Sequence, residues 1–169
     1  MDVCCGTGAQ VIEYGRRGII ATGIDIDPSM LKVALRNGMK QKLANVSFYL
    51  ADATELPFAD SCFDYVSVSL GLHDKVRLTR YKVASEMMRV AKPDGTLVFI
   101  DYAVPPVTRI SGFVSRTVEF LAGGDHYKSF KDYIKKGGLE DIFKVFNLHE
   151  DKRDCLKGGL LSIVKISIT

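Results

Sequence analysis

Short apolar runs alternate with segments of helical periodicity along most of the chain. Alternating or continuous apolar residues predict strands at 1–5, 18–25, 46–52, 63–70 and 96–104. Apolar residues at helical spacing predict intervening helices at 9–17, 28–43 and 78–92, and Asp27 and Pro28 supply the N-cap and first turn of the second of these. Strands and helices in alternation predict an α/β fold, a doubly wound, mostly parallel sheet with helices on both faces.

The pattern changes after residue 104. Residues 105–138 predict a helical insertion on the substrate side, with an inward-facing second helix over 125–139 and an apolar stripe of Ile110, Phe113, Val114, Val118 and Leu121. The segments 139–150 and 158–169 are rich in residues that favour strands, so we predict that they form a terminal antiparallel pair. We expect a single domain over residues 1–169.

Composition narrows the class of protein. The chain is 47% hydrophobic and 25% charged, which is ordinary for a globular domain, and its net charge of +3 is too small to indicate a nucleic-acid partner. No apolar stretch approaches the roughly 20 residues of a membrane helix. The four cysteines lack metal-ligand spacing, so we expect no metal site and interpret them as reduced thiols of a cytoplasmic protein.

Acidic residues stand at or near the ends of several predicted strands. The carboxyl ends of parallel strands meet at one edge of a sheet, and ligands bind there at the switch point of the strand order. The glycine turn "CGTG" directly follows the first strand, and such turns allow the backbone to approach a ligand closely. The acids that this topology would gather at the edge are Asp2, Asp25, Asp52 and Asp101.

Three ligand classes use a glycine turn between a strand and a helix. A phosphate-binding loop needs a lysine that does not follow Gly8 at the required spacing, which excludes that class. A dinucleotide turn needs a small third residue where this chain has Val11, so a nicotinamide-dependent oxidoreductase is a remote alternative. S-adenosylmethionine has no phosphate and needs a carboxylate for its ribose, a role that fits Asp25, about 20 residues beyond the glycines.

The adenine of such a cofactor needs a hydrogen-bond acceptor and apolar surfaces. Asp52, at the end of the third strand, can accept from the adenine amine, and Ile26 and Met30 can sandwich its faces.

Four ordered motifs connect the chain to a known family. The stretches "DVCCGTG", "GIDIDPSML", "LADATELPFADSCFDYV" and "RVAKPDGTLVFIDY" resemble successive motifs of class I S-adenosylmethionine-dependent methyltransferases, and look most like the small-molecule branch that contains the ubiquinone and menaquinone methyltransferases. The resemblance implies a Rossmann-like seven-stranded sheet with an antiparallel last strand. It implies cofactor contacts at Asp2, Gly6, Thr7, Gly8, Asp25, Ile26, Asp52 and Ala53, to which we add Cys4, Met30 and Ser69 at the same edge.

Two features depart from the family pattern. Cys4 stands where the family commonly has glycine, and we expect the small thiol to be tolerated with a backbone that avoids positive φ. The family normally has a full first strand and helices before this motif, whereas this chain begins within the strand. We therefore expect an N-terminally truncated version, and an S-adenosylmethionine-binding protein without catalysis is an alternative function.

The candidate catalytic residues lie on the predicted acceptor side. His73 follows the fourth strand, and His126 and Tyr127 begin a helix of the insertion, where any of them can act as a base toward the acceptor. We predict methyl transfer to a small, apolar or aromatic acceptor such as a quinone precursor, which would leave S-adenosylhomocysteine. We also expect that the chain can form a homodimer.

Overall fold

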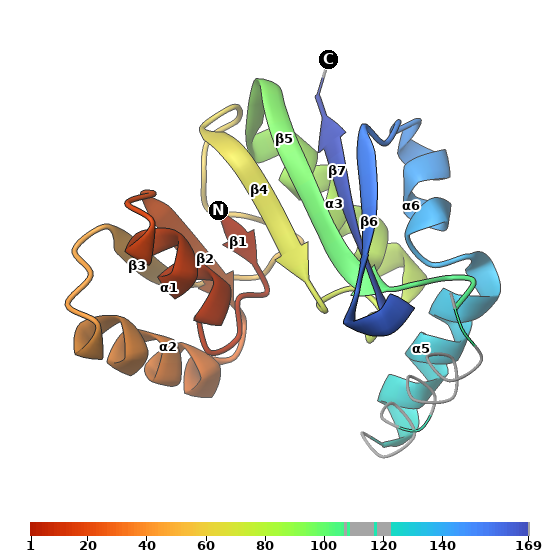
Figure 1. Cartoon of the computed structure of the whole chain (residues 1–169), viewed down its shortest axis with the longest axis horizontal. Coiled ribbons are helices and arrows are strands. Elements are labelled where there is room, and N and C mark those ends of the chain that lie inside the picture. Colours follow the sequence, from red (N-terminus) through yellow and green to blue (C-terminus); the bar gives the residue numbers. More distant parts are fainter. Residues whose placement is uncertain (107, 109–116, 118–122, 169) are drawn as a thin grey trace.

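One seven-stranded sheet runs through the computed structural model, in which residues 1–106, 108, 117 and 123–168 are described (Figure 1). The strand order is β3-β2-β1-β4-β5-β7-β6, and every neighbouring pair is parallel except β5–β7 and β7–β6. The predicted fold class, including the antiparallel last strand, is therefore confirmed. The strands are β1 (Asp2–Val3), β2 (Ala21–Asp25), β3 (Val46–Leu50), β4 (Phe63–Ser69), β5 (Ala91–Tyr102), β6 (Lys152–Leu156) and β7 (Leu161–Ser167).

The helices begin and end close to the predicted positions in the first part of the chain. Asp27 caps α2 by accepting a hydrogen bond from the Ser29 amide at 2.7 Å, with Pro28 in the first turn as predicted. The described helices are α1 (Ala9–Arg16), α2 (Pro28–Lys40), α3 (Arg77–Val90), α5 (Gly124–Lys136) and α6 (Leu139–Phe146), and η1 (Lys157–Gly159) is a short turn of 3₁₀ helix.

The predicted strand at 139–150 is wrong, because this segment forms α6. Leu139, Ile142 and Phe143 recur at helical spacing and are all buried, while Glu140 and Asp141 occupy the first turn. The helical period therefore prevailed over the strand preference of the individual residues. The terminal antiparallel pair exists, but β6 supplies the partner of β7.

The insertion is described only in its second part. Helix α5 has the predicted inward side chains, with Phe130 and Tyr133 fully buried and Ile134 partly buried. The first apolar stripe, Ile110, Phe113, Val114, Val118 and Leu121, lies outside the described residues.

Helices cover both faces of the sheet, as neighbouring residues of β2 show. Gly23 faces α1, where a side chain would collide with Val11, whereas Ile24 belongs to the large core on the opposite face. That core packs α3 and α6 against β4, β5 and β7, and a smaller one packs α1 and α2 against β2 and β3 (Figure 1). None of the described helices combines the length and apolarity needed to cross a membrane.

The topology places the loops after β1 and β4 next to each other. Strand β1 pairs with β2 on one side and with β4 on the other, so the strand order reverses direction at β1. This is the switch point at which open α/β sheets leave room for a ligand.

Candidate functional site

A cavity of about 820 Å³ opens at the carboxyl ends of β1, β2, β3 and β4. Its size falls in the range of small-molecule sites. Seven of the predicted cofactor residues line it, and they come from the end of β2, the start of α2 and the loops after β1, β2 and β3: Cys4, Gly6, Asp25, Ile26, Met30, Asp52 and Ala53.

The glycine turn contributes Gly6 to the lining of this cavity. Gly6 has a φ of +53°, and no atom of the described residues lies within 4 Å of where a Cβ would stand, so its backbone is open. Gly8 has a φ of +76°, and a Cβ there would lie 2.7 Å from Phe48 and 2.9 Å from Ala34. The turn therefore requires glycine at Gly8 for packing as well as for conformation.

Cys4 does not behave as predicted, because its φ is +57°. The left-handed backbone explains why glycine suits this position, and the thiol tolerates it at some cost in strain. Burial raises the pKa of the Cys4 thiol to about 11, so it lines the cavity as a neutral group near pH 7. Val11, the residue that argued against a dinucleotide turn, is fully buried against Gly23.

Asp25 closes β2 and is held by two backbone amides. Its Oδ2 accepts from the Gly6 amide at 2.8 Å and its Oδ1 accepts from the Asp27 amide at 2.9 Å. An ionised carboxylate has about four acceptor positions, so two remain for donors on a ligand. The same contact ties the glycine turn to the end of β2.

Asp52 presents a second carboxylate after β3. The amide and hydroxyl of Thr54 both donate to its Oδ1 at 2.8 Å, and these hydrogen bonds lower the pKa of Asp52, the amide contributing most. The carboxylate is therefore ionised near neutral pH and acts only as an acceptor. Ile26 and Met30 line the same cavity and expose apolar surface, with Ile26 66% exposed.

Four predicted cofactor residues do not line the cavity. Asp2 is buried and accepts from the Ser67 hydroxyl at 2.7 Å; burial raises its pKa to about 6, although this hydrogen bond acts in the opposite direction. Thr7 is exposed, and its carbonyl accepts from Asn37 at 3.4 Å. Gly8 caps α1, and Ser69 ends β4. These residues support the turn and the strand ends beside the cavity.

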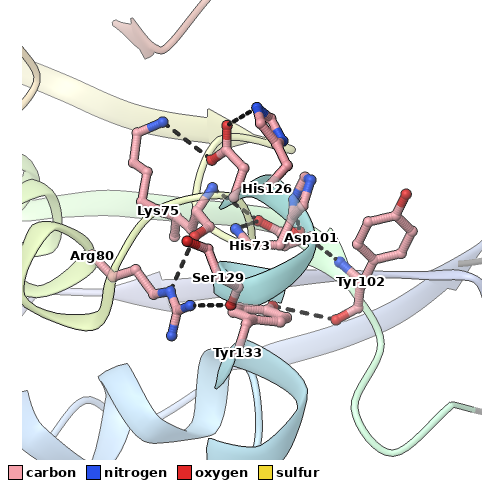
Figure 2. A network of polar contacts seen from close by, with 10 residues as sticks. His73, Lys75, Arg80, Asp101, Tyr102, His126, Ser129 and Tyr133 are labelled. Atoms are coloured by element: carbon pink, nitrogen blue, oxygen red, sulfur yellow. Dashed lines mark hydrogen bonds and ion pairs between the residues drawn. The ribbon is translucent and has the colours of Figure 1, made fainter. Parts of the chain in front are cut away.

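His73 is buried and is not among the residues that line the cavity; it belongs to a network of polar contacts with Asp101 (Figure 2). Its Nδ1 is 2.7 Å from Oδ1 of Asp101, and that carboxylate also accepts from the backbone amides of Leu72, His73 and Tyr102. A carboxylate with this many donors acts as an acceptor, so we assign the ring proton to Nδ1. Nε2 is then the basic atom of the imidazole.

Aromatic rings surround this histidine. The ring of His73 meets Tyr102 edge-on at 4.8 Å between centroids, and Phe130 and Tyr133 lie at 6.3 and 6.5 Å. Tyr133 donates from its hydroxyl to the Tyr102 carbonyl at 3.3 Å, and burial raises its pKa well above the usual value. The rings thus join α5 to the end of β5.

A buried arginine that the sequence did not single out completes the network. Arg80 is 1% exposed and donates to the carbonyls of Leu72 at 3.2 Å and Ser129 at 2.6 Å. It also forms an ion pair with Asp132 at 3.0 Å, and its guanidinium lies over Tyr133 (Figure 2). Arg80 therefore fastens α5 to both α3 and the loop that carries His73.

The two other catalytic candidates, His126 and Tyr127, lie in different surroundings. His126 lines the cavity, is half-exposed, and lies 3.9 Å from Asp74, which contacts Lys75 at 3.2 Å (Figure 2). Tyr127 instead packs at the edge of the Tyr102 and Phe130 cluster, beneath Lys131. Asp74 and Lys75 also line the cavity; only their place directly after His73 could have indicated them from sequence.

Comparison with known proteins gives a consistent result. Residues 1–99 match the family described as "Methyltransferase domain". A demethylmenaquinone methyltransferase of Listeria welshimeri is 36% identical over 140 residues, which cover 79% of this chain and 58% of the relative, and one of Renibacterium salmoninarum is 38% identical over 105 residues, covering 62% and 41%. The chain thus spans somewhat more than half the length of the first of these relatives.

Solved structures share the fold. Magnesium protoporphyrin IX methyltransferase of Synechocystis, solved with bound S-adenosylhomocysteine, superposes with a TM-score of 0.74 at 18% identity, covering 99% of this chain and 73% of that one.

Proposed function

We propose that this chain, which belongs to the class I S-adenosylmethionine-dependent methyltransferase family, transfers the methyl group of S-adenosylmethionine to a small apolar or aromatic acceptor. The observation that carries the proposal is the hydrogen bond from the Gly6 amide to Asp25, two residues that both line the cavity. The carboxylate keeps open acceptor positions, and no described side chain covers the space beside Gly6.

The residues around the cavity fit this cofactor. Asp25 can accept from the two ribose hydroxyls, Asp52 from the adenine amine, and Ile26 offers an exposed apolar surface for the base. The open space at Gly6 suits the methionine part, where any Cβ would intrude. When bound, S-adenosylmethionine supplies an activated methyl group with its own leaving group.

The chain's contribution to the chemistry is to hold the acceptor and receive a proton. Of the three candidates, His126 lines the cavity among the described residues, so we assign the base to His126 and not to His73 or Tyr127. The pair of His73 and Asp101 instead fixes the loop after β4 and the rings that close this side. Positioning of this kind supplies a large part of the catalysis when the cofactor is already activated.

The acceptor is proposed to be a quinone precursor. The Listeria and Renibacterium relatives are named as demethylmenaquinone methyltransferases, and the exposed Leu70, directly after β4, gives the cavity an apolar surface. A flat, apolar ring packs favourably against such a side chain.

Calorimetric titration and turnover test the function separately. We expect saturable binding of S-adenosylhomocysteine and none of NAD, and release of S-adenosylhomocysteine when a demethylated naphthoquinol is added with S-adenosylmethionine. Binding without turnover on a panel of phenolic and quinol acceptors would favour the non-catalytic alternative. Saturable NAD binding would contradict the proposal.

A variant pair tests the base. His126→Gln should reduce turnover about 100-fold or more and leave S-adenosylhomocysteine affinity unchanged. His149→Gln, at an exposed histidine far along the chain, should leave both unchanged. Full turnover in His126→Gln would show that no proton is taken by this side chain.

A further inference from the structure

A second hollow lies along the outer side of α2. This α2 groove, of about 740 Å³, is lined by the apolar residues Leu31, Leu35, Met39, Phe48 and Leu50 and by the cations Lys32, Arg36 and Lys40. Large apolar side chains are normally withdrawn from water, yet Met39 is 78% exposed, Leu50 62% and Leu35 50%. They gather on one surface formed by α2 and the edge strand β3.

The cations of the groove form a row next to the apolar residues. Lys32, Arg36 and Lys40 follow one another at a spacing of four along α2, so they lie on the same side of the helix, and all three are exposed. Within the described part of the chain, none of them takes part in an ion pair. The sequence of α2 contains no acidic residue, so the positive charge of this side is not compensated within the helix.

We propose that the α2 groove docks the protein onto an anionic lipid surface. An apolar row flanked by unpaired lysine and arginine is the pattern of helices that lie in the interface of a bilayer, where the apolar side chains enter the lipid and the cations meet its phosphates. A nucleic acid would use the cations but not the exposed Leu35, Met39 and Leu50. A second copy of the chain would bring the same positive row against itself.

The groove adjoins the candidate cofactor cavity. Met30, in the first turn of α2, lines the cavity, and its neighbour Leu31 lines the groove. Docking through α2 would therefore bring the cavity close to the lipid surface. This part rests on the proposed function, because it gives the protein access to an acceptor dissolved in the bilayer.

Vesicle co-sedimentation of the full chain tests the docking without any substrate. We expect the protein to bind vesicles of phosphatidylcholine mixed with phosphatidylglycerol, to bind pure phosphatidylcholine at least tenfold more weakly, and to lose binding as salt is added. Equal binding to the two kinds of vesicle, or none to either, would overturn the proposal. So would binding of a DNA duplex with no vesicle binding.

Matched variants locate the surface. Removing the three cations together (Lys32→Gln, Arg36→Gln and Lys40→Gln) should weaken binding to anionic vesicles about a hundredfold. The control (Lys135→Gln, Lys136→Gln and Lys144→Gln) removes the same charge from exposed positions of α5 and α6 and should change binding far less. An equal loss of vesicle affinity in both variants would mean that the net charge of the protein alone drives binding. It would contradict a site on α2.

The apolar residues have a test of their own. Leu35→Ser with Met39→Ser should weaken vesicle binding about tenfold or more while S-adenosylhomocysteine affinity and thermal unfolding stay unchanged, which separates this proposal from the proposed function. Sedimentation velocity should give the same oligomeric state for the unmodified chain and for the serine variant. A dimer that the serine variant disrupts would assign the groove to a second copy instead.

Discussion

The two sides of the cavity are built in different ways. The side with the glycine turn, where we propose that the cofactor binds (the cofactor side), is held by backbone turns and short-range contacts, with Gly6 hydrogen-bonded to Asp25 only 19 residues away. The side with α5, where we propose that the acceptor binds (the acceptor side), is held by buried side chains that join distant segments, such as Arg80 to Asp132 across 52 residues and to Ser129 across 49. The first side depends on backbone conformation, whereas the second depends on tertiary packing.

This difference has a functional consequence. A cofactor common to a family needs the same few atoms in the same places, and a glycine turn tied to a strand end supplies them with little help from the rest of the fold. An acceptor site must be shaped for its own substrate, and here a separate helix, α5, is fastened over the sheet by Arg80. We therefore expect substitutions on the two sides to affect different properties.

We expect the largest loss of stability from a substitution on the acceptor side, at Arg80. Arg80→Met leaves the carbonyls of Leu72 and Ser129 without this donor and separates Asp132 from its partner. We expect a loss of about 3 kcal/mol in the free energy of unfolding, measured by urea denaturation, because a buried group is removed from several partners at once.

An exposed ion pair provides the control for Arg80. Lys92→Met removes a contact of 2.8 Å to Asp64 at the surface and should cause a much smaller loss, because water screens such pairs. A similar loss in the two variants would mean that Arg80 is not a structural fastener of α5.

The next effect tests the cofactor side with two glycines of similar conformation. Gly8 and Gly18 have φ values of +76° and +80°, but only at Gly8 would a Cβ collide with other side chains. Gly18→Ala should cost about 1–2 kcal/mol from the left-handed backbone alone. Gly8→Ala should cost about 1 kcal/mol more, in denaturant unfolding, because Phe48 and Ala34 must move. Equal costs would mean that the turn is not packed as described.

The smallest expected effect is the pH dependence of stability that comes from the Asp2 carboxyl. Burial raises the pKa of this carboxyl from 3.8 to about 6, so the folded state holds its proton more tightly than the unfolded state. Its contribution to stability is full below about pH 4 and is lost as the pH rises through 6, a change of roughly 2 kcal/mol between pH 4 and 7.

Asp2→Asn tests the pH-dependent contribution of Asp2 to stability, because asparagine does not titrate. The stability difference between the two proteins, followed by thermal unfolding, should shift in favour of Asn as the pH rises from 4 to 7. A difference that stays constant over this range would show that Asp2 titrates alike in both states.

Sequence alone could bring together most of the residues of the proposed cofactor side. The glycine turn, the acids closing β2 and β3, and the cap of α2 are local signals, and seven of the predicted cofactor residues line the cavity. Cys4 was expected to avoid positive φ, yet its φ is +57°, because residue identity alone does not report backbone strain. Asp2 was placed correctly on β1, but its pairing with Ser67 depends on the partner strand β4.

The acceptor side could be predicted only in part. His73 and Asp101 could each be seen at a strand end, but their 2.7 Å contact depends on β4 and β5 lying side by side. The sequence did not indicate that Arg80 is buried, because a basic residue on a helix is usually exposed and the partners of Arg80 lie far along the chain. The segment 139–150 was mistaken for a strand because its aromatic and β-branched residues outweighed their helical spacing.

The most direct test of the central claim is the affinity of S-adenosylhomocysteine for the unmodified chain and for Asp25→Ala, measured by titration calorimetry, with Asp94→Ala as an exposed control. Loss of the charged acceptor should weaken binding by about 1–3 kcal/mol in Asp25→Ala and leave it unchanged in the control. Equal affinity in all three proteins would show that the carboxylate at the end of β2 does not hold the cofactor.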